Sequence, residues 1–287
     1  AGRPLPSTLC VIENLMATET VLDTLLFVDT NVLLDFYRIR KSDVGTKYLE
    51  QLEACRDRLI IGSQIEMEYK KNRQRVILEA QASFGAPDWA KLTAPALVSD
   101  LQAVKAIEKK KKELLEQKNK VAEKIKKILS DPTHHDRVYQ CLQRLFKHTS
   151  QYNLVRPMKE RFLIRNLARK RFILGYPPRK QNDTSIGDAV NWEWIVYCSQ
   201  QSGKHVVIVT RDTDYGVTFD GKSYINDYLR QEFSERVSKK RKLILTDKLS
   251  AGLKIVHAAV TKEMEEEEER ILAEIANEFE DLTQHDA

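Results

Sequence analysis

The chain alternates short apolar runs with longer segments in which apolar residues recur every three or four positions. Runs of four or five residues, each followed by a polar turn, predict buried strands. They are Leu25–Val28, Arg58–Ile61, His205–Val209 and Lys242–Leu245. Because a helical spacing follows each run, the pattern predicts an α/β fold with a central parallel sheet of four to five strands. Residues Leu253–His257 fit either a fifth strand or a helix, and the pattern leaves that choice open.

The middle of the chain lacks strand-like runs and predicts helices instead. In the charged segment from Leu97 to Asp131, apolar positions three and four apart predict one long helix with a narrow apolar face. Two shorter helices are predicted over Arg137–Phe146 and Pro157–Leu174. We therefore expect a helical insertion at residues 87–175, between two parts of an α/β core at residues 20–86 and 176–260.

The last segment, residues 261–287, predicts an acidic helix. Six of the seven residues from Glu263 to Glu269 are glutamate. A solvated helix face is the expectation for such a run. Packing against the basic surface of the same protein, or docking of a partner, are the alternatives.

Composition and charge narrow the class of protein. Of 287 residues, 42% are hydrophobic and 31% charged, and the net charge of +5 weakly favours an anionic partner. No apolar run reaches the roughly 18 residues of a membrane span, so no membrane association is expected. Four cysteines lie far apart without a CxxC pair, which predicts reduced thiols and a cytoplasmic location. They are Cys10, Cys55, Cys141 and Cys198.

Acidic residues follow the predicted strands at positions where α/β folds bind ligands. Asp29 comes directly after the first strand, and Asp212 and Asp214 come after the third. Because the carboxyl ends of parallel strands meet at one edge of a sheet, these acids are expected to lie together. Glu68 and Asp188, each near the start of a predicted helix, can join them there.

Each of these acids also has a structural explanation as a helix cap or an Asx turn. Ser63 with Glu66, and Ser185 with Asp188, have the spacing of a capping box. For Asp247, which follows the last predicted strand, a helix cap is the preferred explanation.

Taken together, the acids indicate chemistry. Four or five carboxylates in one place repel one another unless they take up protons or a cation. Ligand sets made only of oxygen suit Mg²⁺ or Mn²⁺. A divalent ion held in this way can activate water and polarise a phosphodiester, so the pattern points to phosphodiester hydrolysis.

The same stretches resemble the PIN-like nuclease family. The resemblance is carried by FVDTNVLLDFYR, SQIEMEYKKNR, GDAVNWEWI and VVIVTRDTDYG. It implies a three-layer α/β sandwich with a long helical insertion and an acidic site for Mg²⁺ or Mn²⁺. Most members cut RNA, and relatives cut DNA flaps. Matched motif by motif, the ion ligands and catalytic acids would be Asp29, Glu68, Asp188 and Asp212.

The resemblance implies further roles around these ligands. Asp214 would be an outer ligand or a base. Thr30, Asn31 and Thr210 would orient carboxylates or waters. Arg211 departs from the family, which has more acids at that place, and it adds positive charge that leaves the choice between Asp212 and Asp214 open.

A basic stretch precedes Asp188. Between Arg156 and Lys180 there are nine Lys or Arg residues and one acid, and three arginines spaced by four form a stripe on one helix face. Such a stripe can track nucleic-acid phosphates, and pairing with acids elsewhere in the chain is the alternative. The candidate nucleic-acid-binding residues are Arg73, Arg161, Arg165, Arg169, Arg179 and Lys180.

The sequence therefore predicts an endoribonuclease that depends on Mg²⁺ or Mn²⁺, and by resemblance a toxin or phage-defence role. A phosphatase of the haloacid dehalogenase type is disfavoured, because that class needs a second Asp where Asn31 stands. A structure-specific DNA nuclease and a catalytically inactive binding module are the alternatives. A second copy or a protein partner is expected at the helical arm or the acidic tail.

Overall fold

The computed structural model describes residues 23–82, 94–179 and 185–285, with side chains to residue 277 of the last helix. The chain divides into two compact units, one formed by residues 1–73 and 144–287 and the other by residues 74–143. The strands are β1 Thr24–Val28, β2 Leu59–Gly62, β3 Asn153–Leu154, β4 His205–Val209, β5 Gly216–Phe219, β6 Lys222–Ile225 and β7 Leu243–Thr246. The α-helices are α2 Thr30–Leu34, α3 Ser42–Ala54, α4 Ser63–Ala82, α5 Gln102–Ser130, α6 Pro132–His135, α7 Arg137–Lys147, α8 Glu160–Leu174, α9 Gly187–Ser202, α10 Asp227–Arg236, α11 Leu249–Ile255 and α12 Lys262–His285.

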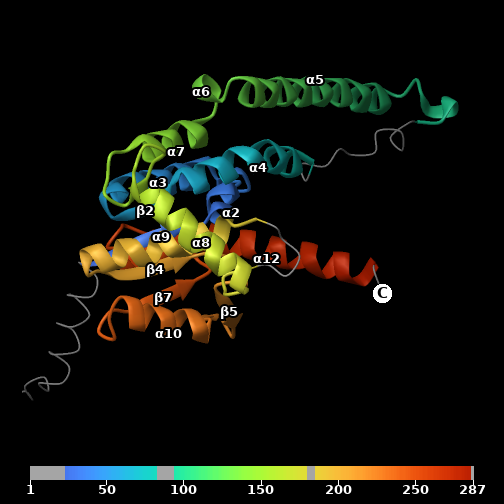
Figure 1. The fold of residues 1–287 in the computed structure, drawn as a ribbon. Coiled ribbons are helices and arrows are strands. Elements are labelled where there is room, and N and C mark those ends of the chain that lie inside the picture. The colour runs from blue at the N-terminus through green and yellow to red at the C-terminus, as the bar shows by residue number, and fades with distance from the viewer. Residues whose placement is uncertain (1–22, 83–93, 180–184, 286–287) are drawn as a thin grey trace, which may run out of the picture. The chain divides into compact units, whose positions relative to one another are not determined.

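A five-stranded parallel sheet in the order β3-β2-β1-β4-β7 forms the centre of the first unit (Figure 1). The four strands predicted from the sequence are present, so the α/β class with a parallel sheet is confirmed. Strands β1 and β4 pair over their whole length, with Val28 opposite Val209. Their carboxyl ends therefore lie level with each other.

Helices cover both faces of this sheet. A Cβ atom at Gly252 of α11 would lie 2.4 Å from a methyl carbon of Val209 and 3.4 Å from one of Leu26, so α11 packs on one face. Phe27, which follows Leu26, contacts the ring of Tyr215, and the Tyr215 hydroxyl reaches the start of α9. Because neighbouring residues of a strand point to opposite faces, α9 lies on the other face. The result is a three-layer sandwich.

Two elements differ from the sequence prediction, and the structure decides one choice that the sequence left open. The two-residue strand β3 lies in a region predicted to lack strands, and it is too short to give an alternating pattern. The open segment Leu253–His257 is not a strand, since α11 continues to Ile255. The antiparallel hairpin β5–β6 was not predicted. Its first residue, Gly216, leaves no room for a side chain, because a Cβ atom there would lie 2.0 Å from the Tyr224 carbonyl oxygen.

The second unit carries the long charged helix. Helix α5 spans 29 residues and has no buried residue, so the narrow apolar face that its spacing predicts is present but is not buried. The structural boundary at Gln74 and Gln143 places α8 and β3 with the sheet. The helical insertion at residues 87–175 stays a prediction. Among the residues that the structure describes, no helix is long and apolar enough to cross a membrane.

Helix α12 corrects the expectation of a solvated acidic face. Glu267 and Glu268 are buried, with 3% and 4% of their surface exposed. All six glutamates of the run have a cationic partner, and four of these partners come from other elements. The partners are Lys47 for Glu263, Lys254 for Glu265, Lys262 for Glu266, Arg270 for Glu267, Arg211 for Glu268 and Lys248 for Glu269.

Candidate active site

Asp29 lies directly past the carboxyl end of β1. It is 3% exposed and caps helix α2, where its Oδ1 accepts a hydrogen bond of 2.6 Å from the Thr30 N–H. Its other oxygen, Oδ2, accepts hydrogen bonds from the Asn31 amide at 3.1 Å and from the Thr210 hydroxyl at 2.6 Å. Asp29 can therefore act both as a helix cap and as a site residue, because Oδ1 binds the start of α2 and Oδ2 binds the residue that follows β4.

Thr210 connects the two strand ends. Its hydroxyl donates to Asp29 and accepts from the Asp212 N–H at 3.0 Å and from the Asn31 amide at 3.4 Å. The register of β1 and β4 brings this about, since Thr210 follows the residue paired with Val28. The predicted orienting role of Thr210 and Asn31 has a direct geometric basis in these contacts.

Glu68 comes from the second turn of α4. Its Oε2 accepts a hydrogen bond of 3.1 Å from the Thr30 hydroxyl, and its Oε1 accepts one of 2.7 Å from the Gln64 amide. A Cβ atom at Gly187 would lie 2.2 Å from Glu68 Oε1. The carboxylate therefore lies against the backbone at the start of α9, one residue before Asp188.

Tyr215 shows that four of the predicted acids converge. Its side chain is fully buried, and its hydroxyl donates to the Asp188 carbonyl oxygen at 3.4 Å. The pKa of Tyr215 is raised well above its ordinary value, first by burial and then by the nearby negative charges. Those charges are the carboxylates of Asp188, Asp29, Glu68 and Asp212.

The crowding of these acids is visible in Asp29. Burial raises the pKa of Asp29, the Asp212 carboxylate raises it further, and Glu68 adds to the effect. Hydrogen bonds from Thr210 and Thr30 oppose the shift without cancelling it, and the pKa reaches about 7. No lysine or arginine of the described residues forms an ion pair with Asp29 to relieve this repulsion.

The donor set fits an oxygen-seeking cation in its chemistry and its charge. Beside Asp29, the Oδ1 atom of Asn31 is buried and has no hydrogen-bond partner among the described residues. A carboxylate cluster with a further unused oxygen is what Mg²⁺ or Mn²⁺ coordinates. Within the described part of the chain, however, no group of three or more His, Cys, Asp or Glu side chains is positioned to hold a metal ion. Binding would have to draw the carboxylates closer together.

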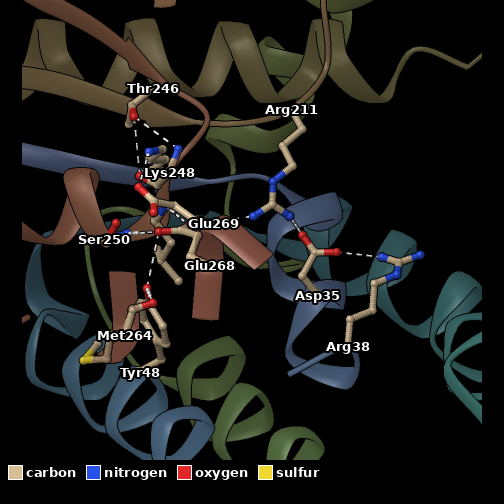
Figure 2. A network of polar contacts seen from close by, with 11 residues as sticks. Asp35, Arg38, Tyr48, Arg211, Thr246, Lys248, Ser250, Met264, Glu268 and Glu269 are labelled. Carbon is tan, nitrogen blue, oxygen red and sulfur yellow. Dashed lines mark hydrogen bonds and ion pairs between the residues drawn. The ribbon is translucent and has the colours of Figure 1, made fainter. Parts of the chain in front are cut away.

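Arg211 does not face the acids, contrary to the expectation of positive charge beside an ion. Its guanidinium forms ion pairs with Asp35 and, at 3.7 Å, with Glu268 of α12 (Figure 2). Arg38 also pairs with Asp35, at 2.6 Å. Burial lowers the pKa of Arg211, while the carboxylates of Glu268 and Asp247 oppose that shift. The arginine therefore ties the loop that carries Asp212 to the acidic helix.

The candidate nucleic-acid-binding residues separate into four groups. Arg73 is only 3% exposed and donates to the Tyr37 hydroxyl at 3.0 Å, so it belongs to the interior and we remove it from the interface. Lys180 lies outside the described residues. Arg169 and Arg179 are exposed, with Arg179 above the ring of Phe172.

Arg161 and Arg165 lie next to the acidic site. They line a small pocket with Gly62, Ser63 and Gln64 at the start of α4, and Gln64 also binds Glu68. Burial lowers the pKa of Arg165, and the neighbouring arginines at 161, 169 and 156 lower it further. The arginines of the stripe therefore repel one another and concentrate positive charge on this face of α8.

Three residues of the site were missed by sequence reasoning. Gln64 precedes Glu68 by one helical turn, a spacing that brings side chains together and could have indicated the contact. Gly187 stands directly before Asp188, where a small residue permits the close approach of Glu68. Tyr215 follows Asp214, and no pattern in the sequence marks it as buried among acids.

Other expectations are met or narrowed by the structure. Trp192 is fully buried and cannot stack on a base, while Tyr176 is exposed and contacts Tyr228. Neither capping box is observed as predicted: Glu66 pairs with Lys70, and the residue that caps α9 is Ile186. Among the described cysteines, Cys55, Cys141 and Cys198 are buried and form no disulfide.

Comparison with known proteins identifies the family of the chain. Residues 26–215 match the PIN domain family, and since the match covers more than half of the chain, the protein belongs to that family. Membership supports a nuclease-type function, and PIN domains typically depend on a divalent metal. No curated protein and no solved structure matched the chain.

Proposed function

We propose that the protein is a metal-dependent endonuclease whose substrate is RNA. The observation that supports this most strongly is the convergence of Asp29, Glu68, Asp188 and Asp212 around one buried tyrosine at the carboxyl edge of the sheet. Neutral donors hold Asp29 and Glu68, and burial together with repulsion from the neighbouring carboxylates raises the pKa of Asp29. A cluster of this kind is stabilised by a divalent cation.

The roles of the residues follow from their contacts. Asp29, Glu68, Asp188 and Asp212 would hold Mg²⁺ or Mn²⁺, which supplies activated water and charge neutralisation at the phosphodiester. Thr210 keeps Oδ2 of Asp29 in place, and Thr30 keeps Oε2 of Glu68 in place. Such contacts fix ligand orientation before substrate arrives. Asp214 is the outer ligand or base in this proposal.

The substrate strand would cross the carboxyl edge of the sheet from the arginine stripe to the acids. Arg161 and Arg165 share the start of α4 with Gln64, which binds Glu68, so stripe and acids are continuous. Lysine and arginine at such a surface displace counterions from phosphates and give salt-dependent affinity. Arg169 and Arg179 extend the stripe outward.

The decisive experiment is a cleavage assay with labelled RNA and DNA of the same sequence. The wild type is expected to cut RNA with Mn²⁺ or Mg²⁺ and to cut nothing with EDTA. DNA cleavage in preference to RNA would replace RNA as the substrate. Cleavage that persists in EDTA would exclude the metal mechanism. If both nucleic acids stay intact but still bind, the protein is a binding module, which the absence of a preformed ion-ligand group in the described residues also allows.

A binding experiment tests the stripe separately from cleavage. Arg165→Gln should weaken RNA binding in EDTA and reduce the slope of log K against log salt by about 0.7, the contribution of one phosphate contact in single strands. Arg230→Gln is the matched control, because Arg230 is an exposed arginine of α10 with a surface ion pair to Asp227. An equal effect of both variants would remove the stripe from the interface.

The proposal extends to the biological setting and to protein partners. A toxin or phage-defence effector acting in the cytoplasm would be tested by expression with and without the intact acids. We propose that a second copy or a protein partner binds along α5, which exposes Ile107, Leu114 and Val121. Sedimentation velocity of the full chain tests self-association.

A further inference from the structure

A cleft of about 280 Å³ opens beside the acidic site. Asp212 lies in its wall, so the cleft is continuous with the carboxylates that would hold the ion. Loops after β4 and β7, the start of β5 and the side of α12 enclose it. The lining residues are Thr210, Arg211, Asp212, Thr213, Gly216, Thr218, Leu245, Asp247, Leu272, Ile275 and Ala276.

Both apolar and polar residues line this cleft. Leu272, Ile275 and Ala276 of α12 provide the apolar wall. The polar and charged lining residues are Thr210, Arg211, Asp212, Thr213, Thr218 and Asp247. The volume is close to the lower end of ligand pockets, roughly 300–1,000 Å³. A small flat ring with polar edges fits these dimensions and this distribution of polarity.

Asp247 has a position that the sequence did not predict. Helix α11 begins after Lys248, and no side chain of its own segment caps it. Instead Glu268 of α12 accepts hydrogen bonds from the Leu249 N–H and, at 2.9 Å, from the Ser250 N–H (Figure 2). Since Glu268 satisfies the helix start, Asp247 is not used as a cap.

The carboxylate of Asp247 is available to the cleft. It is partly exposed, and it accepts no hydrogen bond from any described residue. The cations of Arg211 and Lys248 lie near enough for Asp247 to act on their pKa values. An ionised carboxylate only accepts hydrogen bonds, through two oxygens side by side. It therefore selects a ligand edge that carries adjacent N–H donors.

We propose that this cleft binds a guanine base of the substrate strand next to the cleaved phosphate, with Asp247 accepting hydrogen bonds from N1–H and the N2 amino group. The proposal rests on the nuclease function and adds base specificity to it. Guanine presents two adjacent donors on its pairing edge, whereas adenine, cytosine and uracil present one donor group each. The apolar face of α12 receives the flat side of the ring.

Two measurements test the pocket with the full chain. In the first, mononucleotides GMP, AMP, CMP and UMP, with dGMP as the deoxy arm, are titrated by calorimetry in EDTA. GMP and dGMP should bind at least about tenfold tighter than the others, and Asp247→Asn should weaken GMP binding about 10- to 100-fold. In the second, oligonucleotides that differ at one position are cut with Mn²⁺, and the wild type should prefer guanine next to the cut.

Asp220→Asn is the matched control for both measurements. Asp220 is an exposed carboxylate at the turn of the β5–β6 hairpin, with a φ of 49° that asparagine also tolerates. The control should keep both the affinity for GMP and the preference for guanine. Loss of the preference in Asp247→Asn, with an unchanged melting temperature, is the result we expect.

The failures of the two proposals can be told apart. If the wild type cuts with metal but shows no base preference, or if Asp247→Asn keeps the preference, the guanine pocket is wrong and the nuclease function stands. If the wild type cuts no nucleic acid, the nuclease function is wrong. In that case the titration still decides, since equal affinity for GMP and the other mononucleotides would overturn the pocket.

Discussion

The protein has two concentrations of acidic residues, and the structure treats them in opposite ways. At the carboxyl edge of the sheet, Asp29 contacts only neutral donors and repels Asp212 and Glu68. On α12, the acids of the Glu263–Glu269 run are paired with cations or with backbone N–H groups. The described residues give Asp29 in the first cluster no cationic partner, whereas the acids of the second cluster pair with cations and with a helix start.

The pKa values of the two clusters express this difference. The pKa of Asp29 rises to about 7 through burial and neighbouring carboxylates. For Glu267, burial also raises the pKa, but hydrogen bonds from Arg270 and the Arg40 N–H outweigh it, and the pKa falls below its ordinary value. Both side chains expose only 3% of their surface, but Asp29 lies much deeper in the protein, so its deeper burial and its lack of a cationic partner together set its pKa apart from that of Glu267.

The largest expected effect separates the clusters by activity. Asp29→Asn keeps the size of the side chain but removes a charge that would hold the ion, so Mn²⁺-dependent cleavage should fall at least about 1,000-fold. Glu269→Gln on α12 should change the rate less than about twofold, because Glu269 is exposed and pairs with Lys248 at the surface. Rates on labelled RNA check both, and equal losses would erase the distinction.

Stability should respond in the reverse order. Glu268→Ala removes the partner of Arg211 and the acceptor at the start of α11, and it should lower the free energy of unfolding by about 3 kcal/mol. Glu266→Ala removes an exposed ion pair with Lys262 and should cost less than about 0.5 kcal/mol. Urea denaturation of both variants measures the contrast. Similar costs would mean that α12 is not docked as described.

In the metal-free protein, Asp29 should contribute a loss of stability as the pH rises from about 4 to 7, measured relative to a variant that lacks this carboxylate. Over this range the unfolded chain releases the Asp29 proton near pH 3.8, while the folded chain keeps it until about pH 7. The full difference corresponds to about 4 kcal/mol, and we expect roughly half, because neighbouring carboxylates share the proton.

Thermal unfolding in EDTA at several pH values measures this slope. Asp29→Asn should lack the contribution and should therefore be more stable than the wild type at pH 8 and not at pH 4. Added Mg²⁺ or Mn²⁺ should restore the wild type at pH 8 and leave the variant unchanged. A wild type whose stability rises from pH 4 to 7 by the same amount as that of the variant would contradict the assignment.

The smallest effect concerns orientation and not charge. Thr210→Val removes the hydroxyl that donates to Asp29 and should lower the cleavage rate about 10- to 100-fold, with a stability cost of about 1 kcal/mol. Thr246→Val, at the same end of the neighbouring strand, removes a hydroxyl that contacts only the Lys248 backbone. The rate of that control should stay within about twofold.

Much of the fold was predictable because the buried strands carry continuous apolar runs. Strands β1 and β4 were predicted within one residue, and Asp29 and Asp212 were correctly placed at one edge. The hairpin β5–β6 was missed since its residues are exposed and give no buried pattern. Arg73 was misjudged because a helix buries one side against Tyr37, and a charge pattern alone does not tell which side that is.

By itself, the sequence determined the order of strands and helices, the acids at the strand ends and the resemblance to PIN-like nucleases, because local apolar spacing and short motifs carry that information. Only the tertiary structure decided which acids meet. Glu268 and Asp247 are 21 positions apart, yet one closes a helix and the other faces an open cleft. The different roles of these two acids depend on where α12 packs. Packing between segments that are distant in the sequence produces no periodic pattern of apolar residues, so a single sequence does not reveal it.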